Sequence, residues 1–233
     1  ECSTDCTGRE CGPDGCGGTC PPGCGAGEAC NYGLCELVLD LGWVQIQAGS
    51  FMMGADFDDT QQPIHQVTVP SFYMTKTEVT VGQYASCVNA GACLVPGSSD
   101  HCNWNVAGRT DHPINCVTWH QAAQFCHWAG GRIPTEAEWE YAARSEGQDI
   151  IYPWGDETAT CDYAVMNDGG NGCGQDLTWP VCSKPAGNTD QGLCDMAGNV
   201  YEWVQDWYHE SYDGAPSDGS AWEDPSGDYR VLR

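Results

Sequence analysis

The stretch that decides the fold reads Gly192-Leu-Cys-Asp-Met-Ala-Gly-Asn-Val-Tyr-Glu-Trp-Val-Gln-Asp-Trp207. From Val200 to Tyr208 apolar and polar residues alternate, which predicts a strand. Gly, Asn, Asp and Pro are dense from Gly147 to Gly192, so we expect that region to be mostly loop. A strand that follows so long an irregular run indicates a domain with few regular elements. We therefore predict an irregular α+β fold, fastened by disulfides and bound ions.

A second long stretch, Cys126-His-Trp-Ala-Gly-Gly-Arg-Ile-Pro-Thr-Glu-Ala-Glu-Trp-Glu-Tyr-Ala-Ala-Arg144, contains the start of a helix. Thr135 and Glu138 form a capping box, in which each side chain accepts a hydrogen bond from a backbone N–H of the first turn. Pro134 disfavours an earlier helical start. The pattern therefore predicts a helix over Glu136–Arg144.

The spacing of residues also assigns the two faces of this helix. We expect the core face to carry Ala137, Trp139 and Tyr141. We expect the exposed face to carry Glu136, Glu140 and Arg144. Three carboxylates within five residues could instead perform acid–base catalysis, but a helix cap and an exposed face explain them more simply.

Two more helices and three more strands are expected upstream. The helices begin after Thr80 and Thr118, each with Gln three residues further on, and end near Gly91 and Gly130. Runs of strand-forming residues predict strands over Trp43–Gly54, Val67–Val69 and Phe72–Val79.

The cysteines divide the chain of 233 residues into two parts. Eight of the 17 lie in residues 1–36, which are rich in Gly and Pro and hold almost no aliphatic residue before Leu34. Such a segment cannot fold around a core, so we expect disulfides to hold it. Zinc is the alternative, but the tight cysteine pairs of a zinc ribbon are missing. We interpret residues 1–36 as a cysteine-rich, disulfide-stapled leader, either a stalk or a small carbohydrate-binding knot, and residues 37–233 as a globular domain.

The composition excludes several classes of partner. Lys and Arg total 8 and Asp and Glu total 33, so the formal net charge is −25. So acidic a chain repels nucleic acid and anionic membrane surfaces. No apolar run approaches the roughly 20 residues that span a bilayer. With 41% hydrophobic residues, the chain can still bury a core.

Common catalytic signatures are absent from the sequence. It has no Gly-rich phosphate loop, no Gly-x-Ser-x-Gly elbow and no His-Glu-x-x-His. His120 and His127 could face the same side of one helix, but packing or exposure explains them better than metal binding. Six tryptophans are expected in the core, although a cluster of them could line a peptide groove: Trp119, Trp128, Trp139, Trp154, Trp203 and Trp207.

The two long stretches closely resemble the sulfatase-modifying-factor family, whose best-known members are formylglycine-generating enzymes. Shorter matches support the resemblance: Gly49-Ser-Phe-Met-Met-Gly54, Pro63-Ile-His-Gln-Val67, Phe72-Tyr-Met-Thr-Lys-Thr-Glu-Val-Thr80 and Tyr152-Pro-Trp-Gly155. It covers about Leu37 to the end, and it implies a compact α+β fold related to C-type lectins. Residues 1–36 are similar instead to the cysteine-rich leaders of some bacterial surface proteins.

The resemblance implies a chemistry that this chain does not complete. The family uses O₂ and copper(I), bound by two cysteines, to oxidise a sulfatase cysteine to formylglycine, and soft copper(I) favours such thiolates. In the family those cysteines follow a Gly-Gly-Ser stretch that comes after an Arg-Val-x-(Arg/Lys) segment. Here Tyr229-Arg-Val-Leu-Arg233 matches that segment and the sequence stops. We therefore expect a C-terminally incomplete domain with no catalytic residue, and copper only in a full-length parent.

The resemblance also implies one structural calcium ion. Asp195 and Glu202 would supply carboxylates, and Gly198 and Val200 backbone carbonyls. Calcium takes 6–8 oxygen ligands, and a loop that runs into a strand can present both kinds. The alternative is that Asp195 caps a turn and Glu202 is a surface residue. The family's second calcium site falls at about Val165 and Cys173, which cannot bind the ion, so we expect that site to be lost.

The domain holds nine cysteines, so at least one has no partner within it. Cysteines close in sequence would pair as Cys87–Cys93, Cys102–Cys116, Cys161–Cys173 and Cys182–Cys194. This arrangement leaves Cys126. In the family the matching cysteine bridges to one near the C-terminus, which implies that Cys126 is unpaired here.

Three functions follow as hypotheses. In the first, a full-length parent oxidises the cysteine of a sulfatase-type protein or peptide. In the second, the chain is a non-catalytic, lectin-fold binding module displayed on the cell surface, because fold alone does not settle activity. In the third, it is a calcium-stabilised structural protein. Each is compatible with an extracellular, cell-surface or periplasmic location, which the cysteine content favours.

Overall fold

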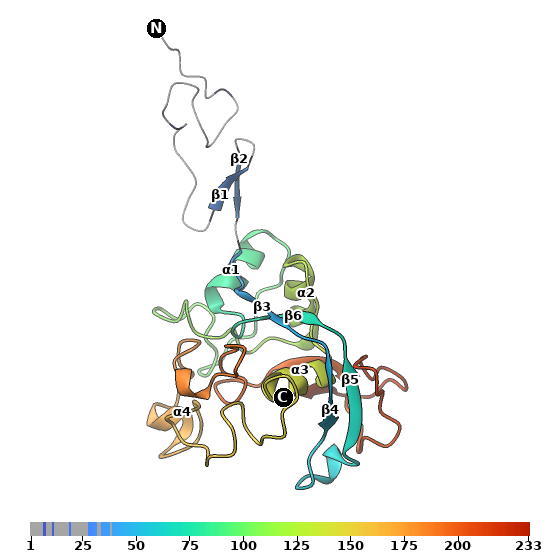
Figure 1. Cartoon of the computed structure of the whole chain (residues 1–233). Helices are drawn as coiled ribbons and strands as arrows, with labels where there is room; N and C mark the ends of the chain where they lie inside the picture. Colours follow the sequence, from blue (N-terminus) through green and yellow to red (C-terminus); the bar gives the residue numbers. More distant parts are fainter. Residues whose placement is uncertain (1–6, 8–10, 12–18, 20–27, 32–33, 38) are drawn as a thin grey trace. The chain divides into compact units, whose positions relative to one another are not determined.

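A computed structural model describes residues 7, 11, 19, 28–31, 34–37 and 39–233. Contacts divide the chain into an N-terminal unit, Glu1–Asp40, and a larger unit, Leu41–Arg233, which we call the domain. Each is described by itself (Figure 1). Within the described ranges, no helix is long and apolar enough to cross a membrane.

The described residues of the N-terminal unit include a pair of strands. Strands β1 (Glu28–Asn31) and β2 (Leu34–Leu37) are antiparallel, and Cys30 lies opposite Cys35 in their register. Cys11 is disulfide-bonded, as expected for a stapled leader. The remaining expectations for this segment fall mostly on residues outside the described ones.

The domain contains three antiparallel strand pairs. Strand β3 (Trp43–Ile46) pairs with β6 (Phe72–Thr75), β4 (Gly49–Met53) with β5 (His65–Val69), and β7 (Trp203–Trp207) with β8 (Arg230–Leu232). The long strand expected over Trp43–Gly54 is therefore two strands with different partners. The strand expected over Phe72–Val79 ends at Thr75, because the chain there turns toward the first helix.

Three helices begin where the capping boxes predicted. They are α1 (Val81–Asn89), α2 (Trp119–Trp128) and α3 (Glu136–Ala143), and in each the Thr and the residue three positions on make both capping hydrogen bonds. The remaining short elements are η1 (Asp59–Gln61), α4 (Asn171–Gly174) and η2 (Pro185–Gly187). Much of the segment between α3 and β7 is loop, as expected. The fold is thus an irregular α+β domain with little regular structure.

The exposed face predicted for α3 is wrong. Glu136 and Glu140 are buried, 9% and 7% exposed. Helix α3 contacts β4, β5 and β7, and these elements enclose it. The carboxylates are tolerated inside because both pair with Arg233, and Glu140 Oε1 also accepts the Gly54 N–H at 2.9 Å.

The core lies between α3 and the strands β3, β4 and β5. Ile46, Val67, Val69 and Leu193 are fully buried, and the Phe51 and Tyr141 rings lie 5.4 Å apart. The six tryptophans expected in the core are only partly buried. Of the six, Trp139 packs against this core. Trp119 and Trp207 instead hold the Arg230 guanidinium 4.2 and 3.6 Å from their ring centroids.

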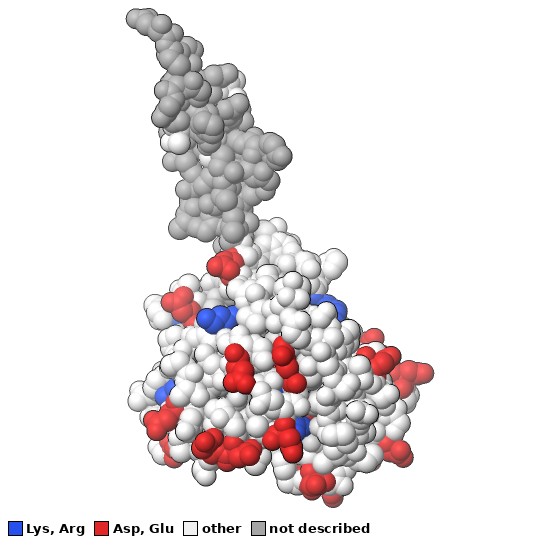
Figure 2. All heavy atoms as spheres, in the orientation of Figure 1, with Lys and Arg blue, Asp and Glu red and all other residues white. Residues whose placement is uncertain are grey.

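Four disulfides fasten the loops of the domain. They are the four sequence-near pairs predicted: Cys87–Cys93, Cys102–Cys116, Cys161–Cys173 and Cys182–Cys194. Cys126 is free, as predicted, and no other free cysteine occurs among the described residues. Figure 2 shows acidic side chains spread over the visible face of the domain with few basic ones between them, as the net charge requires.

Candidate functional site: a buried acidic cluster beside an apolar groove

Three carboxylates from separate segments meet inside the domain. Asp195 lies in the loop that follows Leu193, Glu202 directly precedes β7, and Glu78 lies between β6 and α1. We call these three residues the acidic cluster. Asp195 and Glu78 are buried, 7% and 9% exposed, and Glu202 is partly buried.

Hydrogen bonds occupy only part of the cluster. Asp195 Oδ2 accepts the Cys182 N–H at 2.6 Å, and Glu202 Oε2 accepts the indole N–H of Trp139 at 2.9 Å. Both oxygens of Glu78 are buried without a hydrogen-bond partner. A buried carboxylate without partners is costly, so Glu78 is the member of the cluster that lacks a positive or donating group.

The pKa values of the cluster reflect burial and the proximity of like charges. Burial, together with the neighbouring charges of Asp195 and Glu202, raises the pKa of Glu78 well above its ordinary value. Burial raises the pKa of Glu202 to about 7, with a smaller contribution from Asp195 and against the opposing effect of the Trp139 hydrogen bond. Burial likewise raises the pKa of Asp195. None of the ion pairs in the described part of the chain involves these three residues.

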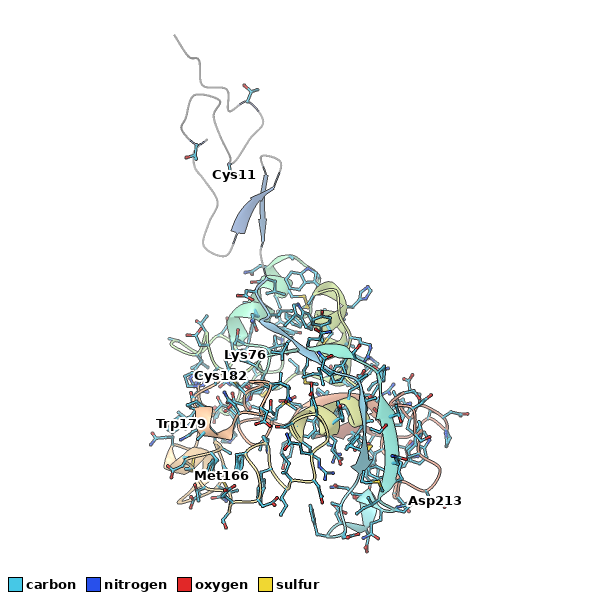
Figure 3. All side chains as sticks on the ribbon, viewed as in Figure 1. Cys11, Lys76, Met166, Trp179, Cys182 and Asp213 are labelled. Carbon is cyan, nitrogen blue, oxygen red and sulfur yellow. A yellow bond between two sulfur atoms is a disulfide. The ribbon has the colours of Figure 1, made fainter. Side chains whose placement is uncertain are left out.

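The backbone between Asp195 and Glu202 is fixed by its neighbours. Gly198 has φ +92°, and a Cβ there would lie 2.5 Å from the Val165 carbonyl oxygen, so only glycine fits. Asn199 donates its N–H to that same oxygen at 2.9 Å, and its side-chain oxygen accepts the Trp179 N–H at 2.9 Å. Figure 3 labels Trp179 and Cys182 on the same side of the domain.

The four residues predicted for calcium, Asp195, Gly198, Val200 and Glu202, lie in and beside this turn. The structure brings Asp195 close enough to Glu202 for its charge to raise the pKa of Glu202. No hydrogen bond among the described residues occupies the Gly198 or Val200 carbonyl. Across the described ranges no three His, Cys, Asp or Glu side chains already surround one point as metal ligands. Two carboxylates, two carbonyls and the unpartnered oxygens of Glu78 nevertheless fit a hard cation.

Sequence reasoning missed Glu78. It was noticed only as part of a predicted strand, Phe72–Val79. The one local signal is an acidic residue directly between a strand and a helix start, a position at which exposed residues are just as frequent. His120 and His127, in contrast, are both exposed, and neither belongs to a group of three potential metal ligands among the described residues.

An apolar groove of about 640 Å³ runs beside the cluster. Its walls include Phe72 and Met74 from β6, Phe125 and Cys126 from α2, and Glu78 and Glu202 from the cluster. A volume of this size is typical of sites that bury a small ligand or a segment of peptide. The groove is thus mostly apolar, and Glu78 and Glu202 of the cluster contribute to its wall.

The cysteines of the domain do not fit copper(I). The metal needs thiolates, but eight of the nine cysteines in the domain are in disulfides. Burial raises the pKa of the remaining one, Cys126, to about 11, so it stays a thiol at neutral pH. No thiolate pair is therefore available in Leu41–Arg233.

These features define a class: small, loop-rich α+β domains stabilised by buried polar clusters and local cross-links. The family model of the sulfatase-modifying factor enzyme 1-like domain matches residues 40–233, and the chain belongs to this family. The fold also matches the structure of PvdO from Pseudomonas aeruginosa, with a TM-score of 0.68 and 30% identity, over 82% of this chain and 80% of that one.

Relatives with different printed functions share the domain. A formylglycine-generating enzyme of Streptomyces coelicolor is 30% identical over 226 residues, covering 73% of this chain and 70% of that protein. The serine/threonine-protein kinase Pkn1 of Chlamydia trachomatis serovar L2 is 33% identical over 208 residues, covering 81% of this chain and 32% of the kinase. The chain thus spans about a third of that relative, so family membership establishes the domain and not the reaction.

Proposed function

We propose that the domain is the substrate-holding part of an oxidoreductase that converts a cysteine of a sulfatase-type protein or peptide to formylglycine. The observation that carries this proposal is the family match over residues 40–233, together with the formylglycine-generating enzyme among the relatives. The groove supports it, because an apolar channel of this volume suits an extended peptide.

The oxidation itself needs two thiolates that the described residues of the domain do not supply. We therefore propose that residues 41–233 bind no copper(I) on their own, and that copper belongs to a full-length parent. When bound, copper(I) would supply the site at which O₂ is activated. The residues present here would orient the peptide and exclude water from the groove.

A second candidate is a non-catalytic binding module displayed on the cell surface. It is favoured by the same lack of a thiolate pair and by the kinase among the relatives, whose printed function is unrelated to cysteine oxidation. Under this proposal the groove binds a ligand without changing it.

Peptide turnover distinguishes the two candidates. A sulfatase-type peptide that contains a cysteine is incubated with copper(I) and O₂, and mass spectrometry is used to detect its conversion to the aldehyde. Protein purified from its natural host should form the aldehyde. The chain of residues 1–233 should bind the peptide without converting it. A matched peptide with Ser in place of Cys is the control. If the protein produced by its natural host makes no aldehyde when loaded with copper(I), the oxidation proposal is wrong and the binding module is supported.

Calcium and location are further parts of the proposal. We propose that Asp195, Gly198, Val200 and Glu202 hold one structural calcium ion, supported by the hard oxygen ligands that meet there. We also propose an extracellular, cell-surface or periplasmic location, supported by four disulfides in the domain. The acidic surface supports the absence of a nucleic-acid partner.

A further inference from the structure

We propose that Glu78 is the third acidic partner of the calcium ion and contacts it through a bound water. This inference rests on the calcium site proposed above and is independent of the proposed oxidation. It adds to the four calcium residues one that lies outside their sequence motif, on a different segment of the chain.

The argument starts from the environment of Glu78. Its side chain is 91% buried, both of its oxygens lack a hydrogen-bond partner, and no Lys or Arg of the described residues forms an ion pair with it. The ionisable groups that act on it are Asp195 and Glu202, which carry the same sign of charge. Three converging carboxylates without a cation repel one another in a medium that screens poorly. A divalent ion between them removes both the repulsion and the unpartnered oxygens.

The backbone holds Glu78 in this position. Cys194 donates its N–H to the Lys76 carbonyl at 2.8 Å, which ties the segment of Glu78 to the loop of Asp195 (Lys76 is labelled in Figure 3). On the other side, the Ile114 N–H bonds the Val79 carbonyl at 2.7 Å. The chain is thus anchored two residues before Glu78 and one residue after it, at the position where this residue is 9% exposed.

The geometry favours contact through water over direct ligation. No three acidic side chains of the described residues are placed as ligands of one ion, so we assign Glu78 an indirect contact while Asp195 and Glu202 bind directly. Two carboxylates and two carbonyls leave several of the 6–8 calcium positions open, and calcium commonly fills such positions with water. A water bound to the ion can donate to Glu78, whose oxygens then gain their missing partner.

Terbium luminescence tests the inference directly. Terbium(III) replaces calcium, and Trp139, whose indole N–H bonds Glu202, lies close enough to excite it. Glu78→Gln keeps the shape and removes the charge, so we expect it to weaken terbium and calcium binding at least about tenfold. Glu78→Asp keeps the charge and should retain most of the affinity. Asp195→Asn removes part of the proposed first layer and should weaken binding more than Glu78→Gln.

Thermal unfolding provides a second readout and a matched control. The rise in Tm on adding calcium to chelator-treated protein should shrink in Glu78→Gln. It should stay at the wild-type value in Glu136→Gln, which alters a buried glutamate that is paired with Arg233. If Glu78→Gln lowers Tm equally with and without calcium, Glu78 is a protonated structural residue and the inference is wrong.

Two further outcomes would also overturn it. One is a wild-type protein that binds neither calcium nor terbium. The other is a terbium site without coordinated water, as measured from luminescence lifetimes in H₂O and D₂O, and this measurement needs no variant that might misfold. Neither readout involves copper or peptide. The Glu78 inference can therefore fail while the proposed oxidation stands, and the oxidation can fail while the Glu78 inference stands.

Discussion

Cys126 shows how the surroundings of one residue decide its chemistry. Its thiol lies in the groove wall, where a reactive cysteine could serve a redox site, yet burial raises its pKa to about 11. The nucleophilic form of cysteine is the thiolate, so at neutral pH this group acts as a small apolar side chain. Its position in the groove makes it a reporter of ligand binding.

The alkylation of Cys126 should be slow and strongly dependent on pH. Because its pKa lies about two units above the ordinary value of 9.0, iodoacetamide at pH 8 should react about a hundredfold more slowly than with the unfolded chain. Mass spectrometry of timed samples measures the rate, and Cys126→Ser gives the background.

The same pKa shift has a consequence for stability. The unfolded chain loses the thiol proton near pH 9 and the folded chain only near pH 11, so this contribution to stability is complete below pH 9 and is lost as the pH rises to 11. Wild-type protein should therefore lose more stability than Cys126→Ser over this range. The raised pKa of Cys126 would be contradicted if the alkylation described above proceeds at equal rates in the folded and unfolded chains at pH 8.

At the scale of elements, α2 and α3 carry the same capping box in different surroundings. Thr118 lies on the surface, and its side chain serves only its own helix. Thr135 is 6% exposed, caps α3 and also donates its hydroxyl to the Gly219 carbonyl at 2.9 Å. One motif thus has a local role in α2 and both a local and a tertiary role in α3.

Replacing the two caps should have unequal effects. Thr118→Ala should lower the free energy of unfolding by about 1 kcal/mol, the usual cost of a lost cap. Thr135→Ala should cost about 2 kcal/mol, because the buried Gly219 carbonyl also loses its donor. Urea unfolding of both variants measures the difference, and equal losses would show that the Gly219 contact contributes nothing.

Features that depend on residues close in sequence could be predicted, and features that depend on distant residues could not. The starts of three helices, the strands and the disulfide pairs depend on residues within about a dozen positions of one another. The burial of Glu140 depends on Arg233, 93 positions away, and the acidic cluster depends on Glu78 meeting Asp195. No local pattern carries that information, so α3 was assigned an exposed face and Glu78 was overlooked.

At the scale of the whole domain, Arg233 joins segments that are far apart in sequence. Its guanidinium pairs with Glu136 and Glu140 of α3, while its backbone exchanges both hydrogen bonds with Glu202 at 2.7 and 2.9 Å. Strand β8 is thereby held against α3 and beside the acidic cluster. Figure 1 shows the C-terminus drawn in front of α3, as these contacts require.

Removing the charge of Arg233 should destabilise the entire domain. Arg233→Met leaves the buried Glu136 carboxylate without a cation and leaves Glu140 with Arg144 alone, and we expect a loss of about 3–5 kcal/mol in the free energy of unfolding. Guanidinium unfolding, followed by tryptophan fluorescence and circular dichroism, measures it. Adding Glu136→Gln to that variant should restore part of the loss, since the carboxylate left without a cation is then neutral. A loss below about 1 kcal/mol would mean that water reaches these carboxylates.

The four disulfides of the domain affect how readily the reduced chain can be refolded. Each closes a loop of only 6 to 14 residues, so the correct partner is close at hand before distant segments have met. Oxidative refolding from the reduced state should therefore form native pairs early, with little reshuffling. Cys126 is the exception: an unpaired thiol can attack a neighbouring bridge, and exchanging it for serine should raise the yield of recombinant protein.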